Sequence, residues 1–233
     1  MTSCYRSSDA LKTRTVGETI LCGTVEIPAP PTRLVADWER DIAQQLQLEP
    51  GDVEALPLAR ARMRWPDYRP CVDAASGWLQ ANGIPGLPGD AEVALMACRG
   101  ARYHHDGAQY SGAAFCNLFL GDDVGLDLHF PHAGLRIPLV RGTVVVFDTC
   151  QPHAVIDRQG EGFHVADFPA DRDCSLVFLT WELPVEHTGL ACALGITFDV
   201  GASTVAPGDE GQLRLDGAPA DLCAESGRWT RTA

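Results

Sequence analysis

Lysine and long apolar runs are nearly missing from this chain of 233 residues. Of its 18 basic residues only Lys12 is a lysine, and 31 acidic residues give a formal net charge of −13. An acidic surface repels phosphate backbones and anionic lipid headgroups, so we expect neither nucleic acid nor a membrane surface as a partner. No apolar stretch approaches the roughly 18 residues that indicate a membrane span.

The nine cysteines have no paired spacing. Their number is odd, no C-x-x-C occurs, and several stand inside apolar runs such as "LMAC" and "AFCNLF". This pattern excludes a disulfide framework and a zinc ribbon, and it is typical of small buried side chains in a reducing compartment. The first twenty residues carry charges throughout and no apolar core of a signal peptide. We therefore expect a cytoplasmic location.

The first 90 residues predict one strand and two helices. Residues 18–30 alternate in polarity and end in prolines, which indicates a strand. In 31–48, Leu34, Trp38, Ile42 and Leu46 fall on one helical face, with Thr32 as the predicted N-cap. Residues 71–84 predict a second helix that stops at Gly83.

After residue 90 the chain consists of short apolar or alternating runs separated by Gly, Pro, Asp and Asn. Many short strands at even spacing favour an antiparallel sandwich or barrel, so the fold class is mostly β with flanking helices. The predicted strands are 91–99, 113–120, 126–130, 135–140, 142–148, 153–157 and 174–183, with 190–200 as one further candidate. The polar tail from about residue 207 has no pattern that places it.

The stretch "RYHHDGAQY" sets His104 and Asp106 one residue apart directly after an apolar run. Residues i and i+2 of a strand point to the same side, so the pair presents an imidazole and a carboxylate together. His105 has the opposite parity and should point away. Two such ligands hold a divalent metal weakly, and a third is needed.

His153 is the best third ligand. It follows the apolar strand and turn "GTVVVFDTCQP" and begins "HAVID", 47 residues beyond Asp106, a gap that allows later strands to fold back across the sheet. Two histidines and one carboxylate form the facial triad of non-heme Fe(II) oxygenases. His129 and His132 form H-x-x-H, but Pro131 and the strand pattern favour a surface or pocket-rim role over a zinc site.

The span 91–183 resembles the Fe(II)/2-oxoglutarate-dependent oxygenase superfamily, in particular its prolyl-hydroxylase-like branch. Four stretches carry the resemblance: "CRGARYHHD", "CNLFLGDDVGLDLHFP", "GTVVVFDTCQPHAV" and "DRDCSLVFLTW". They are similar to the branch's H-x-D segment, its strand-turn-strand, its distal histidine segment and its following strand. The resemblance implies a double-stranded β-helix, or jelly roll, within a single domain over 1–233. Residues 91–200 would form the core, 1–90 an N-terminal elaboration and 201–233 an extension of unknown structure.

The resemblance also implies residue roles. His104, Asp106 and His153 map onto the metal triad, and 2-oxoglutarate would be the cosubstrate. Its far carboxylate needs a cationic partner, for which arginine is suited. In the family this residue opens the strand that follows the distal histidine's strand; Arg172 lies in that place, and Ser175 would add a hydroxyl. The family often shows a basic residue two positions before a hydroxyl residue, whereas Arg172 and Ser175 are three apart, so Arg158 stays open as the competing anchor. Asn117 and Tyr103 are further candidates for the cosubstrate pocket.

These observations predict an Fe(II)- and 2-oxoglutarate-dependent dioxygenase, a hydroxylase that uses O₂ and releases succinate and CO₂. We expect a small-molecule or amino-acid-type substrate. The alternative is a cupin-like jelly roll that binds a ligand or partner without catalysis, although a cupin would carry H-x-H in its first motif and this chain has none. A zinc hydrolase would need H-E-x-x-H, which is also missing.

Overall fold

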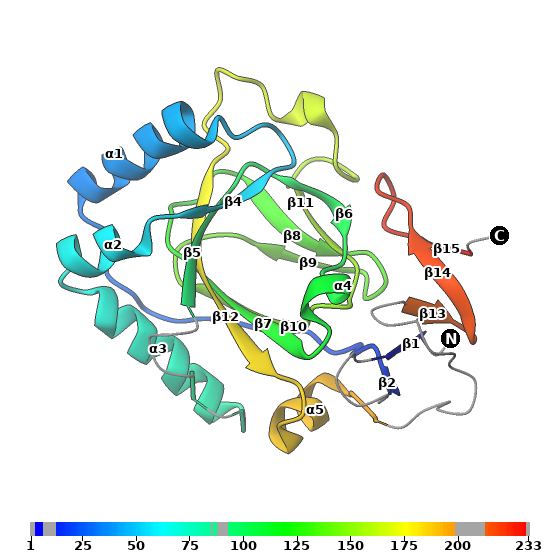
Figure 1. The fold of residues 1–233 in the computed structure, drawn as a ribbon. Helices are drawn as coiled ribbons and strands as arrows, with labels where there is room; N and C mark the ends of the chain where they lie inside the picture. The colour runs from blue at the N-terminus through cyan, green and yellow to red at the C-terminus, as the bar shows by residue number, and fades with distance from the viewer. Residues whose placement is uncertain (1–2, 7–12, 85, 88–92, 199–212, 232–233) are drawn as a thin grey trace.

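Two antiparallel sheets face each other in the computed structural model, which describes residues 3–6, 13–84, 86–87, 93–198 and 213–231 (Figure 1). The larger sheet has the order β3 (Leu21–Thr24), β10 (Thr143–Asp148), β7 (Ala113–Phe119), β12 (Leu176–Pro184), β5 (Val93–Cys98) and β4 (Val53–Leu56). The smaller sheet has the order β6 (Ala101–His104), β11 (His153–Asp157), β8 (Leu126–Phe130) and β9 (Leu135–Pro138).

From β5 to β12 the chain crosses repeatedly from one sheet to the other, in the pattern of a double-stranded β-helix. The larger sheet contributes β5, β7, β10 and β12, and the smaller sheet contributes β6, β8, β9 and β11. The predicted fold class, mostly β with flanking helices, is confirmed. Strands β3 and β4 come from the first 90 residues and extend the larger sheet at its two edges.

Helices from the first 90 residues cover the outer face of the larger sheet (Figure 1). They are α1 (Thr32–Asp41), continued by a π-helical turn (Ile42–Leu46), α2 (Leu58–Arg64) and α3 (Tyr68–Ala81). Leu34 and Trp38 of α1 and Leu79 of α3 belong to one buried apolar cluster with Leu118 and Leu179 of the sheet. The predicted cap is wrong, because Pro31 precedes α1 and no side chain caps it. No described helix combines the length and apolar character that crossing a membrane requires.

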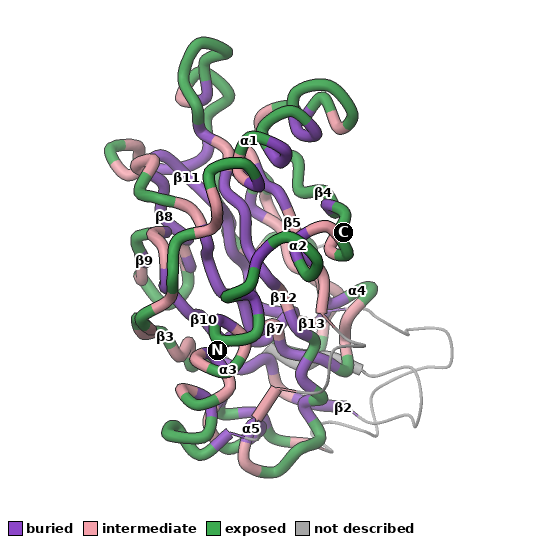
Figure 2. The backbone as a smooth tube through the Cα atoms, turned by 90° about the vertical axis from the view of Figure 1, so that its left-hand side faces the viewer, coloured by how far each residue is buried: buried purple, intermediate pink, exposed green. Residues whose placement is uncertain are grey.

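Aliphatic and aromatic side chains fill the space between the two sheets. The rings of Phe119 and Phe178 are tilted by 31° with 5.1 Å between centroids, and Phe130 and Phe147 meet edge to face at 5.2 Å. All four are at least 92% buried. Figure 2 shows central strands such as β10 and β11 as buried and most connecting loops as exposed. This packing closes the barrel interior and leaves the chemistry to one open end.

A third sheet joins the two ends of the described chain. Its order is β15 (Trp229–Arg231), β14 (Ala218–Leu222), β13 (Leu213–Leu215), β1 (Ser3–Arg6) and β2 (Thr13–Thr15). The sequence did not place this tail, because its strands are short and polar. The expectation of a strand at 190–200 is wrong where the structure describes it. Thr188–Leu194 forms helix α5, since Leu190 and Leu194 lie four residues apart on one buried face and Gly195 ends the helix with φ +73°.

Candidate metal centre

His104 and His153 come together at the open end of the barrel. His104 is the last residue of β6 and His153 is the first residue of β11, and the antiparallel pairing sets them directly opposite each other. Their ring centroids lie 4.4 Å apart. Cross-strand neighbours in register have their side chains on the same face of a sheet. The sheet itself therefore brings the two imidazoles together.

Asp106 completes the cluster from a turn and not from the strand. Strand β6 ends at His104, and Asp106 precedes the short helix α4 (Gly107–Tyr110) with φ −99° and ψ 6°. Its backbone N–H donates to Thr149 O at 2.7 Å. Asp106 Oδ1 lies 3.7 Å from His104 Nε2, and Asp106 Oδ2 lies 3.6 Å from His153 Nε2.

The three side chains can converge on one metal ion. One ligand atom of each lies within 4.8 Å of the other two. The three residues that the sequence singled out are thus brought together by the fold, although strand alternation was the wrong reason for Asp106.

Backbone carbonyls orient both imidazoles. His104 Nδ1 is 2.7 Å from Arg102 O, and His153 Nδ1 is 2.9 Å from Gln151 O. An Nδ1–H that donates to a carbonyl leaves Nε2 unprotonated and available to a metal. Such a partner on the second ring nitrogen is the usual companion of a metal-binding histidine. The donor set, two imidazole Nε2 atoms and one carboxylate, fits a divalent iron ion.

Burial sets the protonation of this cluster. It lowers the pKa of His153 well below its ordinary value, and a charge on His104 lowers it further. The pKa of Asp106 is raised by burial, an effect that His104 opposes. A neutral His153 is in the form that binds a metal, and a bound cation would favour the carboxylate of Asp106.

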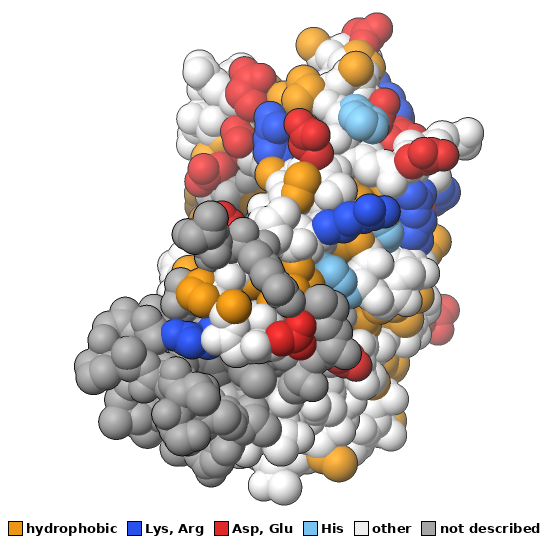
Figure 3. Space-filling view, turned by 90° about the vertical axis from the view of Figure 1, so that its right-hand side faces the viewer, with side chains coloured by type: hydrophobic (Ala, Val, Ile, Leu, Met, Phe, Trp, Pro, Cys, Tyr) orange, Lys and Arg blue, Asp and Glu red, His pale blue; other side chains and the backbone are white. Residues whose placement is uncertain are grey.

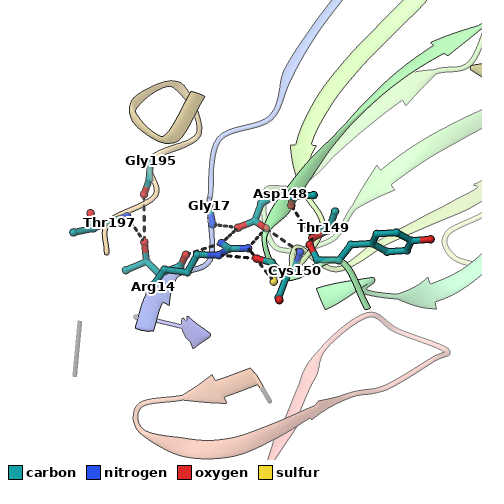
Figure 4. Close-up of polar contacts among 11 residues, drawn as sticks. Arg14, Gly17, Asp148, Thr149, Cys150, Gly195 and Thr197 are labelled. Carbon is teal, nitrogen blue, oxygen red and sulfur yellow. Dashed lines mark hydrogen bonds and ion pairs between the residues drawn. The ribbon is translucent and has the colours of Figure 1, made fainter. Parts of the chain in front are cut away.

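A buried ion pair holds the turn that leads to His153 (Figure 4). Asp148, fully buried at the end of β10, accepts from Arg14 Nη1 at 2.6 Å and Nη2 at 2.9 Å. It also accepts from the backbone N–H groups of Gly17 at 2.6 Å and Cys150 at 3.0 Å. Four donors on one carboxylate fix the chain between β10 and β11. Asp148 was not singled out from the sequence, because an acid at a strand end has no distinctive pattern.

Gly107 allows the Asp106 turn to approach that same segment. A Cβ atom on Gly107 would lie 2.7 Å from Cys150 Sγ, closer than side chains tolerate. Cys150 itself is fully buried, and burial raises the pKa of its thiol well above the ordinary range. The cysteine is therefore a packing residue, in agreement with the interpretation of buried cysteines from the sequence.

A pocket of about 630 Å³ opens on the inner face of the larger sheet at the same end of the barrel. We call it the mouth pocket. None of its described lining residues is basic: they are Val93, Ala94, Gln109, Tyr110, Gly112, Ala113, Thr180, Glu182 and Pro184. Tyr110 belongs to α4, which begins directly after Asp106. A chain of ring contacts, Tyr110 to Phe115 at 5.0 Å, Phe115 to Phe147 at 6.1 Å and Phe147 to His153 at 4.7 Å, connects the pocket to the histidines.

The two arginines predicted as cosubstrate anchors lie toward the other end of β11. Arg172 donates to Asp157 Oδ2 at 2.7 Å and to Val124 O at 2.9 Å. Arg158 donates hydrogen bonds to Asp127 Oδ1 at 2.8 Å and to Asp123 Oδ2 and Oδ1 at 2.8 and 2.9 Å. Asp157 is four residues from His153, which is roughly 13 Å at about 3.3 Å per residue. Each arginine is thus paired with carboxylates near that end of the strand.

The other predicted pocket residues divide between inside and outside. Asn117 lies in β7 directly beside Thr180 of β12, is 8% exposed, and its Oδ1 has no hydrogen-bond partner. It is the predicted cosubstrate residue that the structure sets beside the mouth pocket. Ser175 precedes β12, and its backbone N–H is bonded to Asp173. The predicted role of Ser175 stays a prediction.

Tyr103 neighbours His104 on β6 and therefore faces the opposite side of the smaller sheet. Its hydroxyl lies 2.6 Å from His129 Nδ1. Tyr103, His129 and His132 line a separate pocket of about 630 Å³ on that side, where histidines lie among arginine and acidic side chains (Figure 3). His105 packs against Trp229, with 6.0 Å between ring centroids, and is not one of the three clustered ligands.

Comparisons with known proteins find distant structural similarities only. No protein-family model and no curated protein matches the chain. Among solved structures, a prolyl-4-hydroxylase from Pseudomonas putida is similar at 17% identity over 71% of this chain and 92% of its own, with a TM-score of 0.40.

Two further solved structures are similar at comparable levels. A prolyl 4-hydroxylase from Phytophthora capsici is 15% identical over 64% of this chain and 53% of its own, with a TM-score of 0.36. The non-heme alpha-ketoglutarate-dependent epimerase SnoN is 11% identical over 88% and 92%, with a TM-score of 0.37. The chain is thus similar to prolyl 4-hydroxylases and other 2-oxoglutarate-dependent oxygenases at low identity. The double-stranded β-helix itself is defined by the strand order.

Proposed function

We propose that the protein is an Fe(II)- and 2-oxoglutarate-dependent dioxygenase that hydroxylates a small molecule or an amino-acid side chain. The observation that carries the proposal is the convergence of His104, Asp106 and His153 at the open end of a double-stranded β-helix. Two imidazoles and one carboxylate on one side of a metal leave its remaining positions for other ligands.

Each ligand residue has a defined task. His104 and His153 would bind the iron through Nε2, because Nδ1 of each is directed at a backbone carbonyl. Asp106 would supply the anionic oxygen. When bound, the iron and 2-oxoglutarate would supply the oxidation, in which O₂ hydroxylates the substrate and succinate and CO₂ are released. The aromatic wall of Phe115, Phe147 and Phe130 beside His153 would exclude water from the metal.

The cosubstrate needs a partner for its far carboxylate, and Arg172 remains the better of the two arginines. Arg172 has one carboxylate partner and is 40% exposed, whereas Arg158 is held by two carboxylates. Replacing one carboxylate partner by the carboxylate of the cosubstrate costs less free energy than replacing two. Asn117, beside Thr180 of the mouth pocket, offers an uncharged amide.

The alternative is a jelly roll that binds a ligand without catalysis. A degenerate centre of that kind would have no reason to align both Nε2 atoms on one carboxylate. Metal analysis separates the two, because a binding module need hold no iron.

The proposal is tested by a substrate screen that reads succinate from 2-oxoglutarate with iron-loaded protein. We expect one substrate class to raise succinate release above the substrate-free rate. His153→Ala should abolish that increase, and His129→Ala, on the outer side of the same sheet, should retain it. Succinate release that is equal in the wild type and His153→Ala contradicts the proposal.

A further inference from the structure

Glu182 gives the mouth pocket a negative charge that the proposed cosubstrate does not explain. Its side chain lines the pocket, and within the described part of the chain no basic group forms an ion pair with it. A dianionic cosubstrate placed against this wall would be repelled. The pocket therefore suits a ligand of the opposite charge.

Aromatic side chains lie beside Glu182 in the pocket wall. In the pairing of β12 with β7, Glu182 lies beside Phe115, and Thr180 lies beside Asn117, two residues further into the barrel. Phe115 contacts the Tyr110 ring edge to face at 5.0 Å. The wall thus combines a carboxylate with two aromatic rings, which together attract organic cations.

A further acceptor faces the same region. Asn117 is only 8% exposed, and its Oδ1 has no hydrogen-bond partner among the described residues. A buried acceptor without a partner costs free energy until a donor fills it. Burial raises the pKa of the Tyr110 phenol, and the negative charges of Glu182 and Asp106 raise it further.

We propose that the mouth pocket binds an ammonium or guanidinium group of the substrate, with Glu182 as the ionic partner, Tyr110 and Phe115 as the aromatic wall, and Asn117 as a deeper hydrogen-bond acceptor. The pocket volume of about 630 Å³ accommodates a group of that size with room for the carbon chain that leads to the metal. This inference rests on the proposed function, because the bound group belongs to a substrate only if the protein is the proposed oxygenase. The binding itself does not depend on catalysis.

The test compares three probes of one shape on full-length protein. Benzylamine is a cation at neutral pH, benzyl alcohol is neutral, and phenylacetate is an anion. Their dissociation constants are measured by ligand-observed NMR titration, with and without Mn(II). We expect benzylamine to bind about tenfold or more tightly than benzyl alcohol, and phenylacetate to bind most weakly. A charge-assisted hydrogen bond accounts for roughly 10- to 150-fold in affinity, and an exposed carboxylate lies at the lower end.

Variants assign the effect to the pocket. Glu182→Gln keeps the shape and should remove the preference for benzylamine, and Glu182→Lys should transfer it to phenylacetate. Glu54→Gln, on the exposed edge strand β4 of the same sheet, removes an equal charge outside the pocket and should change nothing.

Three outcomes overturn the inference: equal binding of amine and alcohol, an unchanged preference in Glu182→Gln, or no saturable benzylamine binding below about 10 mM. The manganese arm separates this failure from failure of the proposed function. Amine binding in a protein that binds no metal would refute the oxygenase and leave the pocket assignment standing. Metal binding without amine binding would refute only the pocket.

Discussion

His104 and His153 lie directly opposite each other in the pairing of β6 with β11, with their rings 4.4 Å apart. Residues that are 49 positions apart in the chain therefore share one face of one sheet. Asp106 reaches the same point because its backbone N–H is bonded to Thr149 O, four residues before His153. The candidate metal centre is thus formed by strand pairing and one turn, and changes to either should affect metal binding.

Metal ions should stabilise the protein through this cluster. Mn(II), used as a surrogate that O₂ does not oxidise, is expected to raise the free energy of unfolding by about 2.7 kcal/mol at 100 times its dissociation constant. His153→Ala should lose this gain, which is measured by thermal unfolding of metal-stripped protein. His129→Ala is the matched control and should retain it, because His129 lies on the other side of the sheet. An equal gain in the wild type and His153→Ala would show that the metal binds elsewhere.

The Arg14–Asp148 pair should contribute strongly to stability. Both side chains are at most 1% exposed, so Asp148→Asn removes the carboxylate that balances the Arg14 charge inside the protein. Breaking a buried pair costs about 3–5 kcal/mol, which is measured by denaturant unfolding. Asp122→Asn, in the exposed pair with Arg141, should cost less than about 1 kcal/mol. Similar costs for the two variants would contradict the account of this turn.

The two arginines should differ in their effect on the cosubstrate. Arg172→Ala is expected to weaken 2-oxoglutarate binding roughly 10- to 150-fold, the loss of one charge-assisted hydrogen-bonded contact. Arg158→Ala should have a much smaller effect, because Asp123 and Asp127 already occupy its guanidinium. Calorimetric titration of the Mn(II)-loaded protein measures both. A larger loss in Arg158→Ala would reverse the assignment and leave the metal centre untouched.

Gly107 should tolerate no side chain. In Gly107→Ala the new Cβ would meet Cys150 Sγ at 2.7 Å, so either the Asp106 turn or the Asp148 turn must shift. We expect weaker Mn(II) binding with retained secondary structure, measured by titration and far-ultraviolet circular dichroism. Gly112→Ala is the control, because a Cβ there meets no atom within 4 Å. The double variant Gly107→Ala with Cys150→Ala should recover metal binding in part, and no recovery would place the cause elsewhere.

The sequence predicts the strands of the barrel well because their apolar runs are short, regular and bounded by turn residues. It also indicates the triad, since an H-x-D and a later histidine after a buried strand are local patterns. It does not predict the helix at Thr188–Leu194, where the same apolar run suits a strand or a helix. Glu182 and Tyr110 are missed for a different reason. Their role depends on which face of β12 lines the pocket and on how α4 turns over it, and both follow from tertiary packing.

The central claim is that His104, Asp106 and His153 hold an iron ion that binds 2-oxoglutarate. Anaerobic titration of the protein with Fe(II) and then with 2-oxoglutarate tests it most directly, because a visible charge-transfer absorption arises only when the cosubstrate chelates the iron. We expect this absorption to saturate at one iron per chain in the wild type, and to be missing in both His153→Ala and Asp106→Ala. Its absence in the wild type, or its persistence in both variants, would contradict the assignment of these three residues.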